Sequence, residues 1–211
     1  MNAAPWITAA ALLLTCASQA AAPVTPVRSM DPQRLAGTWY EVARLPDLRQ
    51  ATCASDVTAH FELRQGDRLK VTQTCRTPTG RLETDVGLAR PDTQDVRHAA
   101  RWKVSFLPRW LQWLPVGQGD LWVVMLDPAY RFAVISEPTR QHLWVMSRSP
   151  KLPAEDLGRI VDRLTADGYP TRQLTLTRQS AVVREIGPDQ AVPFTGRPRL
   201  IVRQAAARNA A

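Results

Sequence analysis

Histidine, cysteine and serine are among the residue types in this sequence that could act as nucleophiles or as acid–base groups. The three histidines, His60, His98 and His142, fall on different predicted strands, and no Gly-x-Ser-x-Gly turn is present. A serine hydrolase needs its serine, histidine and acid at one place. Glycine-rich phosphate loops are also missing from the sequence. We therefore expect a protein that is not an enzyme and that uses no cofactor.

Two of the cysteines form a candidate pair. Cys16 lies in the first 22 residues, which we interpret as an export signal. The two remaining cysteines, Cys53 and Cys75, are an even number. A disulfide between them would close a loop of about 20 residues and stabilise the fold by roughly 3 kcal/mol. The alternative is two buried free thiols. A metal site would need more ligands nearby than His60, so we expect none.

The first 22 residues have the features of an export signal. They carry no charged side chain and contain an apolar stretch that is too short to span a membrane. Small residues at positions 18–22 suit ordinary signal cleavage, whereas Leu13-Leu14-Thr15-Cys16 resembles a lipobox, in which Cys16 would be lipidated. Both alternatives predict an exported protein, in the periplasm or on the outer membrane, where disulfides are stable. Residues 23–30 would then form a linker.

The composition indicates one globular domain. The chain has 211 residues, a formal net charge of +8 and 45% hydrophobic residues. Its basic residues are mostly arginines, and they are scattered along the chain. Nucleic-acid-binding proteins usually gather basic residues on one face, so we expect no nucleic-acid partner. After the first twenty positions, no apolar run reaches the roughly 18 residues of a membrane-spanning helix.

Short alternating segments separated by turn residues predict eight β-strands. Their spacing is typical of hairpins, which favours an up-and-down barrel or a sandwich. The expected strands are residues 38–44, 57–63, 68–74, 82–89, 100–106, 121–126, 130–136 and 142–147.

One helix is expected after these strands, and a tail after the helix. Leu157, Ile160 and Leu164 follow the spacing of one apolar helix face. Pro153 suits the first helical position and Gly168 the position after the helix. A short strand at residues 173–177 could follow. Residues 180–211 are basic and lack periodicity, so we expect them to be mostly disordered.

Two segments carry a resemblance to a known family. Residues 31–46 read DPQRLAGTWYEVARLP, and residues 142–150 read HLWVMSRSP. Together they resemble the first and last signatures of the lipocalins, and most closely the bacterial branch of Blc and apolipoprotein D-like lipocalins. The resemblance covers residues 31–179 and implies an eight-stranded antiparallel up-and-down barrel with one C-terminal helix packed outside. It also implies that Trp39 and Arg148 form a structural pair that closes one end of the barrel.

Such a barrel can hold one small ligand. Alternation along the strands then selects the side chains that point inward. The interior expected in this way is apolar and includes aromatic and methionine side chains. The expected cavity-lining residues are Val57, Ala59, Phe61, Leu69, Val71, Gly87, Ala89, Trp102, Val104, Phe106, Leu121, Val123, Met125, His142, Trp144 and Met146.

This interior predicts binding and storage or transport of a small hydrophobic ligand. A fatty acid or lysophospholipid fits, because burying each methylene group contributes about 0.8 kcal/mol. A sterol, a tetrapyrrole or a filled barrel without ligand are the alternatives, and His142 could contact a polar head group. A second hypothesis is a non-carrier envelope module that uses the Trp110–Leu114 loop or the basic tail. That loop could also contact a membrane surface. We expect a monomer or a weak dimer.

Overall fold

Nine β-strands and two α-helices make up the part of the chain that the structure, a computed structural model, describes: residues 22–92, 100–108, 110–111 and 117–180. The strands are β1 Gly37–Arg44, β2 Ser55–Arg64, β3 Arg68–Arg76, β4 Leu82–Pro91, β5 Arg101–Ser105, β6 Gln118–Leu126, β7 Phe132–Ser136, β8 Leu143–Ser147 and β9 Thr175–Leu176. The helices are α1 Pro32–Leu35 and α2 Ala154–Ala166, and two single 3-10 turns, η1 Leu48–Gln50 and η3 Thr171–Gln173, accompany them.

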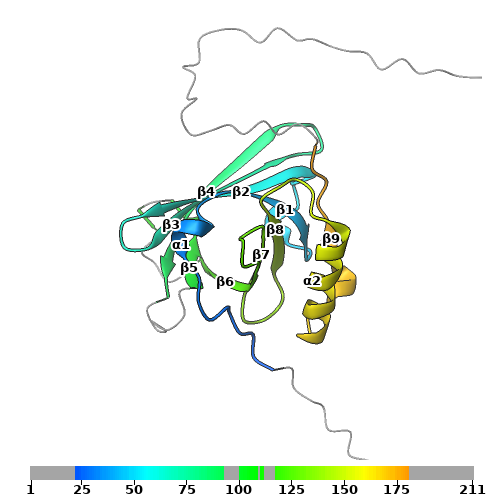
Figure 1. The fold of residues 1–211 in the computed structure, drawn as a ribbon. Coiled ribbons are helices and arrows are strands. Elements are labelled where there is room, and N and C mark those ends of the chain that lie inside the picture. Colours follow the sequence, from blue (N-terminus) through cyan, green and yellow to red (C-terminus); the bar gives the residue numbers. More distant parts are fainter. Residues whose placement is uncertain (1–21, 93–99, 109, 112–116, 181–211) are drawn as a thin grey trace, which may run out of the picture. The chain divides into compact units, whose positions relative to one another are not determined.

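The first eight strands form a closed barrel (Figure 1). Each strand pairs with the next in antiparallel fashion, and β1 closes the sheet by pairing with both β2 and β8. The short strand β9 pairs with the last two residues of β1, Ala43 and Arg44, on the edge opposite β8. The predicted eight-stranded up-and-down barrel with one C-terminal helix is therefore confirmed, and the sandwich alternative is wrong.

One end of the barrel, which we call the closed end, is covered by the N-terminal part of the described chain. The side chain of Asp31 accepts a hydrogen bond from the Gln33 amide, 2.9 Å away, and so caps α1. Residues 22–30, expected as a linker, lie against the barrel: Val24 and Met30 are buried, and the Val27 amide donates to the Val123 carbonyl. The opposite end, which we call the mouth, lies where β1 leads into η1.

The barrel wall separates two clusters of buried apolar side chains, one inside the barrel and one outside it. The inner cluster fills the barrel and contains Trp39, Phe61 and Trp102. The outer cluster lies between the wall and α2, where Ile160 and Leu164 pack with residues of β1, β7 and β8. The helix begins one residue later than predicted, because Pro153 is its N-cap rather than its first residue. Gly168 follows the helix with a φ of +82°, which confirms its predicted position.

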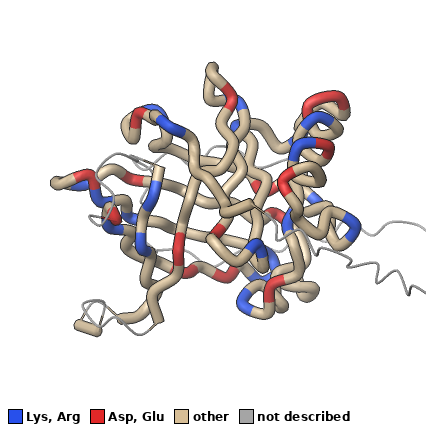
Figure 2. Tube along the Cα trace, turned by 90° about the horizontal axis from the view of Figure 1, so that it is seen from below, with Lys and Arg blue, Asp and Glu red and all other residues tan. Residues whose placement is uncertain are grey.

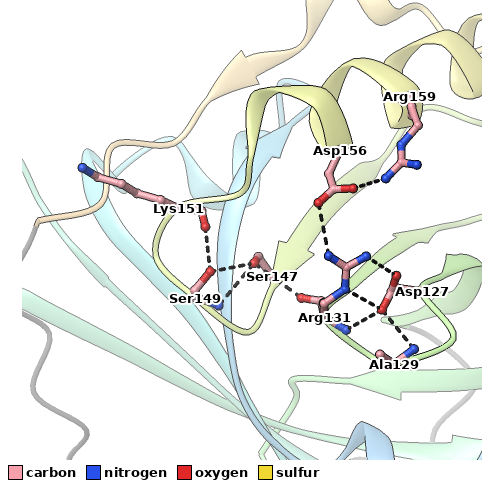
Figure 3. Close-up of polar contacts among 8 residues, drawn as sticks. All are labelled: Asp127, Ala129, Arg131, Ser147, Ser149, Lys151, Asp156 and Arg159. Atoms are coloured by element: carbon pink, nitrogen blue, oxygen red, sulfur yellow. Dashed lines mark hydrogen bonds and ion pairs between the residues drawn. The ribbon is translucent and has the colours of Figure 1, made fainter.

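Ion pairs fasten α2 to the closed end (Figure 3). The guanidinium of Arg131 donates two hydrogen bonds to the Asp127 carboxylate, at 3.1 and 2.8 Å, and also faces Asp156 of α2 at 3.5 Å. Asp156 is buried and pairs with Arg159 on the same helix. Each acid in this group therefore has a cationic partner, which offsets the cost of its burial.

A strap formed by residues 177–180 closes the seam between β1 and β2 near the mouth. The two strands pair directly only from Gly37 to Tyr40. Beyond that point, the Gln179 side-chain amide donates to the Glu41 carbonyl at 2.7 Å and to the Val57 carbonyl at 2.8 Å. Asp56 accepts hydrogen bonds from the amide and hydroxyl of Ser180. The strap therefore replaces the missing strand pairing.

Basic and acidic residues both occur throughout the described part of the chain. Figure 2 shows basic and acidic positions interspersed along the barrel and α2. Within the described residues, no helix is both long and apolar enough to cross a membrane.

Candidate ligand-binding cavity

A cavity of about 260 Å³ opens at the mouth of the barrel. Its volume is close to the lower end of the range for ligand pockets, about 300–1,000 Å³. Its wall is mainly apolar, and all eight barrel strands contribute side chains to it. Nine of the sixteen side chains expected to line it do so: Val57, Ala59, Phe61, Val71, Val104, Phe106, Leu121, Trp144 and Met146.

Four other expected residues point inward but lie below the cavity, in the filled half of the barrel. Leu69, Ala89, Trp102 and Val123 are buried in the inner cluster with Trp39. The indole of Trp102 donates a hydrogen bond to the Asp67 carbonyl at 3.2 Å, so this ring has a fixed place in the core. Alternation identified the inward side of these strands, but it did not show where the filled core ends and the cavity begins.

Gly87 was expected to line the cavity, but an aromatic ring occupies the space beside it. A Cβ atom at Gly87 would lie only 2.8 Å from Cδ1 of Phe106. The glycine therefore allows Phe106 to lie close against β4, where this ring lines the cavity. Any larger residue at this position would displace the ring.

Met125 was expected inside the barrel, and the structure places it outside. A bulge in β6 shifts the pairing with β7 between Val123 and Met125, so that Val123 faces Ile135 but Met125 faces Val134. The extra residue reverses the alternation. Met125 consequently packs against the outer cluster, and Leu126 packs against the inner one.

His142 lies beside the mouth rather than in the cavity wall. Its Nδ1 is 3.7 Å from the Glu137 carboxylate, and its ring stacks on Trp144 with the ring centres 6.2 Å apart. Glu137 also accepts hydrogen bonds from the backbone of the β7–β8 turn. Burial alone would raise the pKa of Glu137, but a hydrogen bond from the Thr139 hydroxyl together with these backbone hydrogen bonds outweighs it and lowers that pKa. The structure therefore gives His142 a partner within the turn.

The Trp39–Arg148 pair lies at the closed end. The guanidinium carbon of Arg148 is 3.9 Å from the centre of the Trp39 ring. The same guanidinium donates to the carbonyls of Arg34, Ala36 and Thr38, at 2.6, 2.9 and 3.1 Å. Burial lowers the pKa of Arg148. The pair holds α1 and β1 to the end of β8.

A polar chain at the mouth was not predicted from the sequence. Glu41 is 1% exposed and lines the cavity, where its carboxylate accepts hydrogen bonds from Arg44 at 2.7 Å and from the Gln50 amide at 3.1 Å. The Gln50 side-chain oxygen in turn accepts a hydrogen bond from the Trp144 indole at 2.9 Å. This chain fixes the Trp144 ring in the cavity wall and anchors η1 beside it. No local pattern in the sequence around Gln50 specifies these partners.

Charged side chains of both signs surround the mouth. Arg49 donates two hydrogen bonds to Asp47, at 3.2 and 2.9 Å, through Nε and Nη2. Burial would raise the pKa of Asp47, but the hydrogen bonds and charge of Arg49 lower it further than burial raises it. Asp120, paired with Lys103, lies on the same rim, as do Glu83 and Asp85. A polar head group would therefore meet both a cation and several carboxylates.

The wall of the mouth also contains the disulfide. Cys53 and Cys75 are bonded, with their Cα atoms 5.5 Å apart, and both line the cavity. The predicted disulfide is confirmed, and the alternative of free thiols is wrong. The bond joins the segment after η1 to the end of β3, and so it fixes that segment to the cavity wall.

Several expected features lie partly or wholly outside the described residues. In the loop 110–114, Trp110 is 73% exposed and Leu111 is described, while the remaining three residues are not. Cys16, the first segment and residues 181–211 are also outside the described part. No group of three or more histidine, cysteine, aspartate or glutamate side chains with metal-site geometry occurs among residues that are described.

Comparison with known proteins assigns the barrel to a family. A family model for the lipocalin-like domain matches residues 30–179. The chain is 31% identical over 157 residues to temperature-induced lipocalin-1 of Arabidopsis thaliana, covering 73% of this chain and 82% of that protein. It is 32% identical over 174 residues to the outer membrane lipoprotein Blc of Escherichia coli strain K12, covering 82% of this chain and 93% of that protein.

A solved structure supports the same fold. Insecticyanin from the tobacco hornworm Manduca sexta matches with a TM-score of 0.59 at 17% identity, covering 75% of this chain and 85% of that one. Lipocalins are binding and transport proteins rather than enzymes, and their ligands are small and hydrophobic. With its signature segments on the paired strands β1 and β8 of a closed barrel and a matching family model, the chain belongs to the lipocalin family.

Proposed function

We propose that this protein binds one fatty acid or lysophospholipid in the mouth cavity and stores or transports it in the bacterial cell envelope. The observation that carries this proposal is the combination of an apolar wall with a charged rim in one cavity. The wall can desolvate an acyl chain, and each methylene group that leaves water contributes about 0.8 kcal/mol. The rim keeps a polar head at the mouth in contact with water.

The cavity's size and charges favour a single-chain lipid over the alternatives. A volume of about 260 Å³ suits one flexible chain better than a flat sterol or tetrapyrrole. Arg49 uses Nε and Nη2 to hold Asp47, which leaves its Nη1 directed along the rim toward Gly119. That nitrogen suits a carboxylate or phosphate oxygen. The neighbouring carboxylates suit an amine, as in the head of a zwitterionic lysophospholipid.

The proposed location rests on the first segment and on the relatives. Residues 1–22 have the composition of an export signal, and the Blc relatives are named outer membrane lipoproteins. The disulfide suits an oxidising compartment. We therefore place the protein in the periplasm or on the outer membrane, with a lipid anchor if Cys16 is modified.

Contact with a membrane surface belongs to the same proposal. Leu48 of η1 is 94% exposed, and Trp110 is 73% exposed, and both belong to connections at the mouth. Exposed apolar side chains beside a lipid cavity suit brief insertion into a bilayer surface. The second candidate function, an interaction module without a ligand, is favoured by the same exposed Trp110. We expect a monomer or a weak dimer in either case.

The test is native mass spectrometry with lipid extraction on the protein expressed with its own signal. The proposal predicts one co-purifying fatty acid or lysophospholipid per chain. The same spectrum gives the mature N-terminus, and a diacylglyceryl mass on Cys16 would show anchoring. A barrel that is empty, and that also takes up neither lipid on titration, would contradict the carrier proposal and favour the interaction module.

A further inference from the structure

One strand of the barrel has a free edge at the mouth. The strand β4 pairs with β3 from Leu82 to Ala89, but with β5 it pairs only from Leu88 to Pro91. Residues 82–87 therefore have a strand on one side, and no described strand lies on the other. In Figure 1, β4 extends past β5 toward the ends of β2 and β3. The ring of Phe106 lies against the inward face of Gly87, and we take residues 82–86 beyond it as the free edge.

The free edge lacks most of the features that usually prevent another strand from pairing with it. Proteins blunt such edges with lysine, proline or a bulge. Residues 82–86 contain neither residue type, and the register with β3 is continuous through them. On the outward face, Leu82 is 56% exposed and Val86 is 49% exposed. The edge is therefore regular in backbone and apolar on its outer face.

Acidic side chains on the inward face determine which partner would fit. Glu83 and Asp85 both lie at the cavity rim. Glu83 is held by Arg81 and by the Thr52 hydroxyl, whereas no cation among the described residues pairs with Asp85. A carboxylate without a cationic partner beside a free edge favours a strand that brings a basic residue to the opposite position.

A second copy of this chain fits poorly on the same edge. Antiparallel pairing of two β4 edges about Thr84 would place Glu83 opposite Asp85 of the other copy. Like charges at directly opposite positions destabilise a pair of strands. Charge repulsion therefore disfavours pairing with the same edge of a second copy, and the acidic residues favour a segment with basic side chains.

We propose that residues 82–86 of β4 form a docking edge for an extended peptide in which basic and apolar residues alternate. The peptide adds one strand to the barrel, so that its backbone amides and carbonyls form hydrogen bonds with those on the free edge of β4. Its basic side chains face Glu83 and Asp85 at the rim, and its apolar side chains lie beside Leu82 and Val86. This partner site shares the rim carboxylates with the proposed lipid head group, but it does not use the apolar wall that would hold the lipid chain.

The test measures amide hydrogen exchange of residues 82–86 in the full chain with a seven-residue peptide of alternating valine and arginine. A peptide of the same composition with consecutive arginines, and an alternating valine–glutamate peptide, are the controls. We expect the alternating basic peptide to slow exchange at this edge by about tenfold or more, and the controls to leave it unchanged.

A pair of charge variants makes the test specific. Asp85→Lys places a cation at the edge and should weaken binding of the alternating basic peptide by about tenfold. Asp162→Lys makes the same charge change on the exposed side of α2 and should leave binding unchanged. Equal binding to both variants, or no protection of residues 82–86, would overturn the proposal. Protection in the free chain that grows with concentration, together with a doubled mass, would also overturn it and assign the edge to a second copy.

Discussion

The two ends of this barrel use the same strands for opposite purposes. At the closed end, large rings fill the interior, and Trp39 and Trp102 are essentially unexposed. At the mouth, β2 and β3 present smaller side chains such as Val57, Ala59 and Val71, and a cavity remains between these and the rings of Phe106 and Trp144. The polar groups differ as well, because Arg148 bonds to three backbone carbonyls while Arg49 keeps one nitrogen directed along the rim. The difference shows that alternation along each strand identifies the inward side chains but does not decide where this barrel is packed and where it is hollow.

The largest expected effect comes from a matched pair on β3. Leu69 and Val71 both point inward, but Leu69 belongs to the filled half and Val71 lines the cavity. Leu69→Ala should lower the free energy of unfolding by about 2–5 kcal/mol, because it opens a void in a packed core. Val71→Ala should cost clearly less, since its methyl groups already border a cavity. Urea unfolding of both variants checks this, and equal losses would break the comparison between the two ends.

Removing the disulfide tests how firmly the mouth is held. The double substitution Cys53→Ala with Cys75→Ala should lower the free energy of unfolding by about 3 kcal/mol, because the unfolded chain is no longer constrained. Since both residues line the cavity, lipid affinity should fall as well. Thermal unfolding and lipid titration would measure the two effects. A stability loss with unchanged lipid affinity would show that the bond does not shape the cavity.

Arg148→Lys tests the closed end with the charge retained. An ammonium group cannot reproduce the planar stack on Trp39 or serve three carbonyls at once. We expect a loss of about 2 kcal/mol in the free energy of unfolding, because backbone carbonyls lose their donors. Lipid affinity per folded molecule should stay the same. A variant that kept full stability would show that charge alone closes this end.

The smallest expected effect is a change in acid stability at Asp127. Hydrogen bonds from Arg131 lower the pKa of Asp127 below its usual value. Its stabilising contribution is therefore complete above the unfolded-state pKa of about 3.9 and disappears as the pH falls through the lower folded-state value. Asp127→Asn should cost about 1 kcal/mol at neutral pH. It should also flatten the dependence of stability on pH below about pH 4. Urea unfolding at pH 7 and at acid pH compares the variant with the parent chain.

The strands and their inward faces could be predicted from the sequence because alternation and turn residues are local signals. The predicted segments overlap all eight barrel strands, and the helix face of Ile160 and Leu164 was also predicted. The bulge in β6 could not be predicted, since one extra residue leaves no mark in an apolar run from Leu121 to Leu126. That bulge is why Met125 lies outside the barrel.

The candidate site could be predicted only in part. The inward-facing wall residues follow from alternation. The boundary between cavity and core, however, depends on how side chains from several strands pack together at the same level along the barrel axis. The chain from Glu41 through Gln50 to Trp144 joins segments far apart in the sequence, so no local pattern reveals it. The strap at residues 177–180 could not be predicted for the same reason, because its partners are backbone carbonyls of the distant strands β1 and β2.

The central claim is that the mouth cavity takes up one acyl chain, and a calorimetric titration with a lysophospholipid tests it most directly. Val57→Trp places a ring in the cavity, whereas His60→Trp places the same ring on β2 outside the barrel wall. The account predicts one lipid bound per chain for the parent protein and for His60→Trp, and a loss of about tenfold or more in affinity for Val57→Trp. Near-ultraviolet circular dichroism would establish that both variants are folded. Unchanged lipid affinity in a folded Val57→Trp variant would contradict the claim.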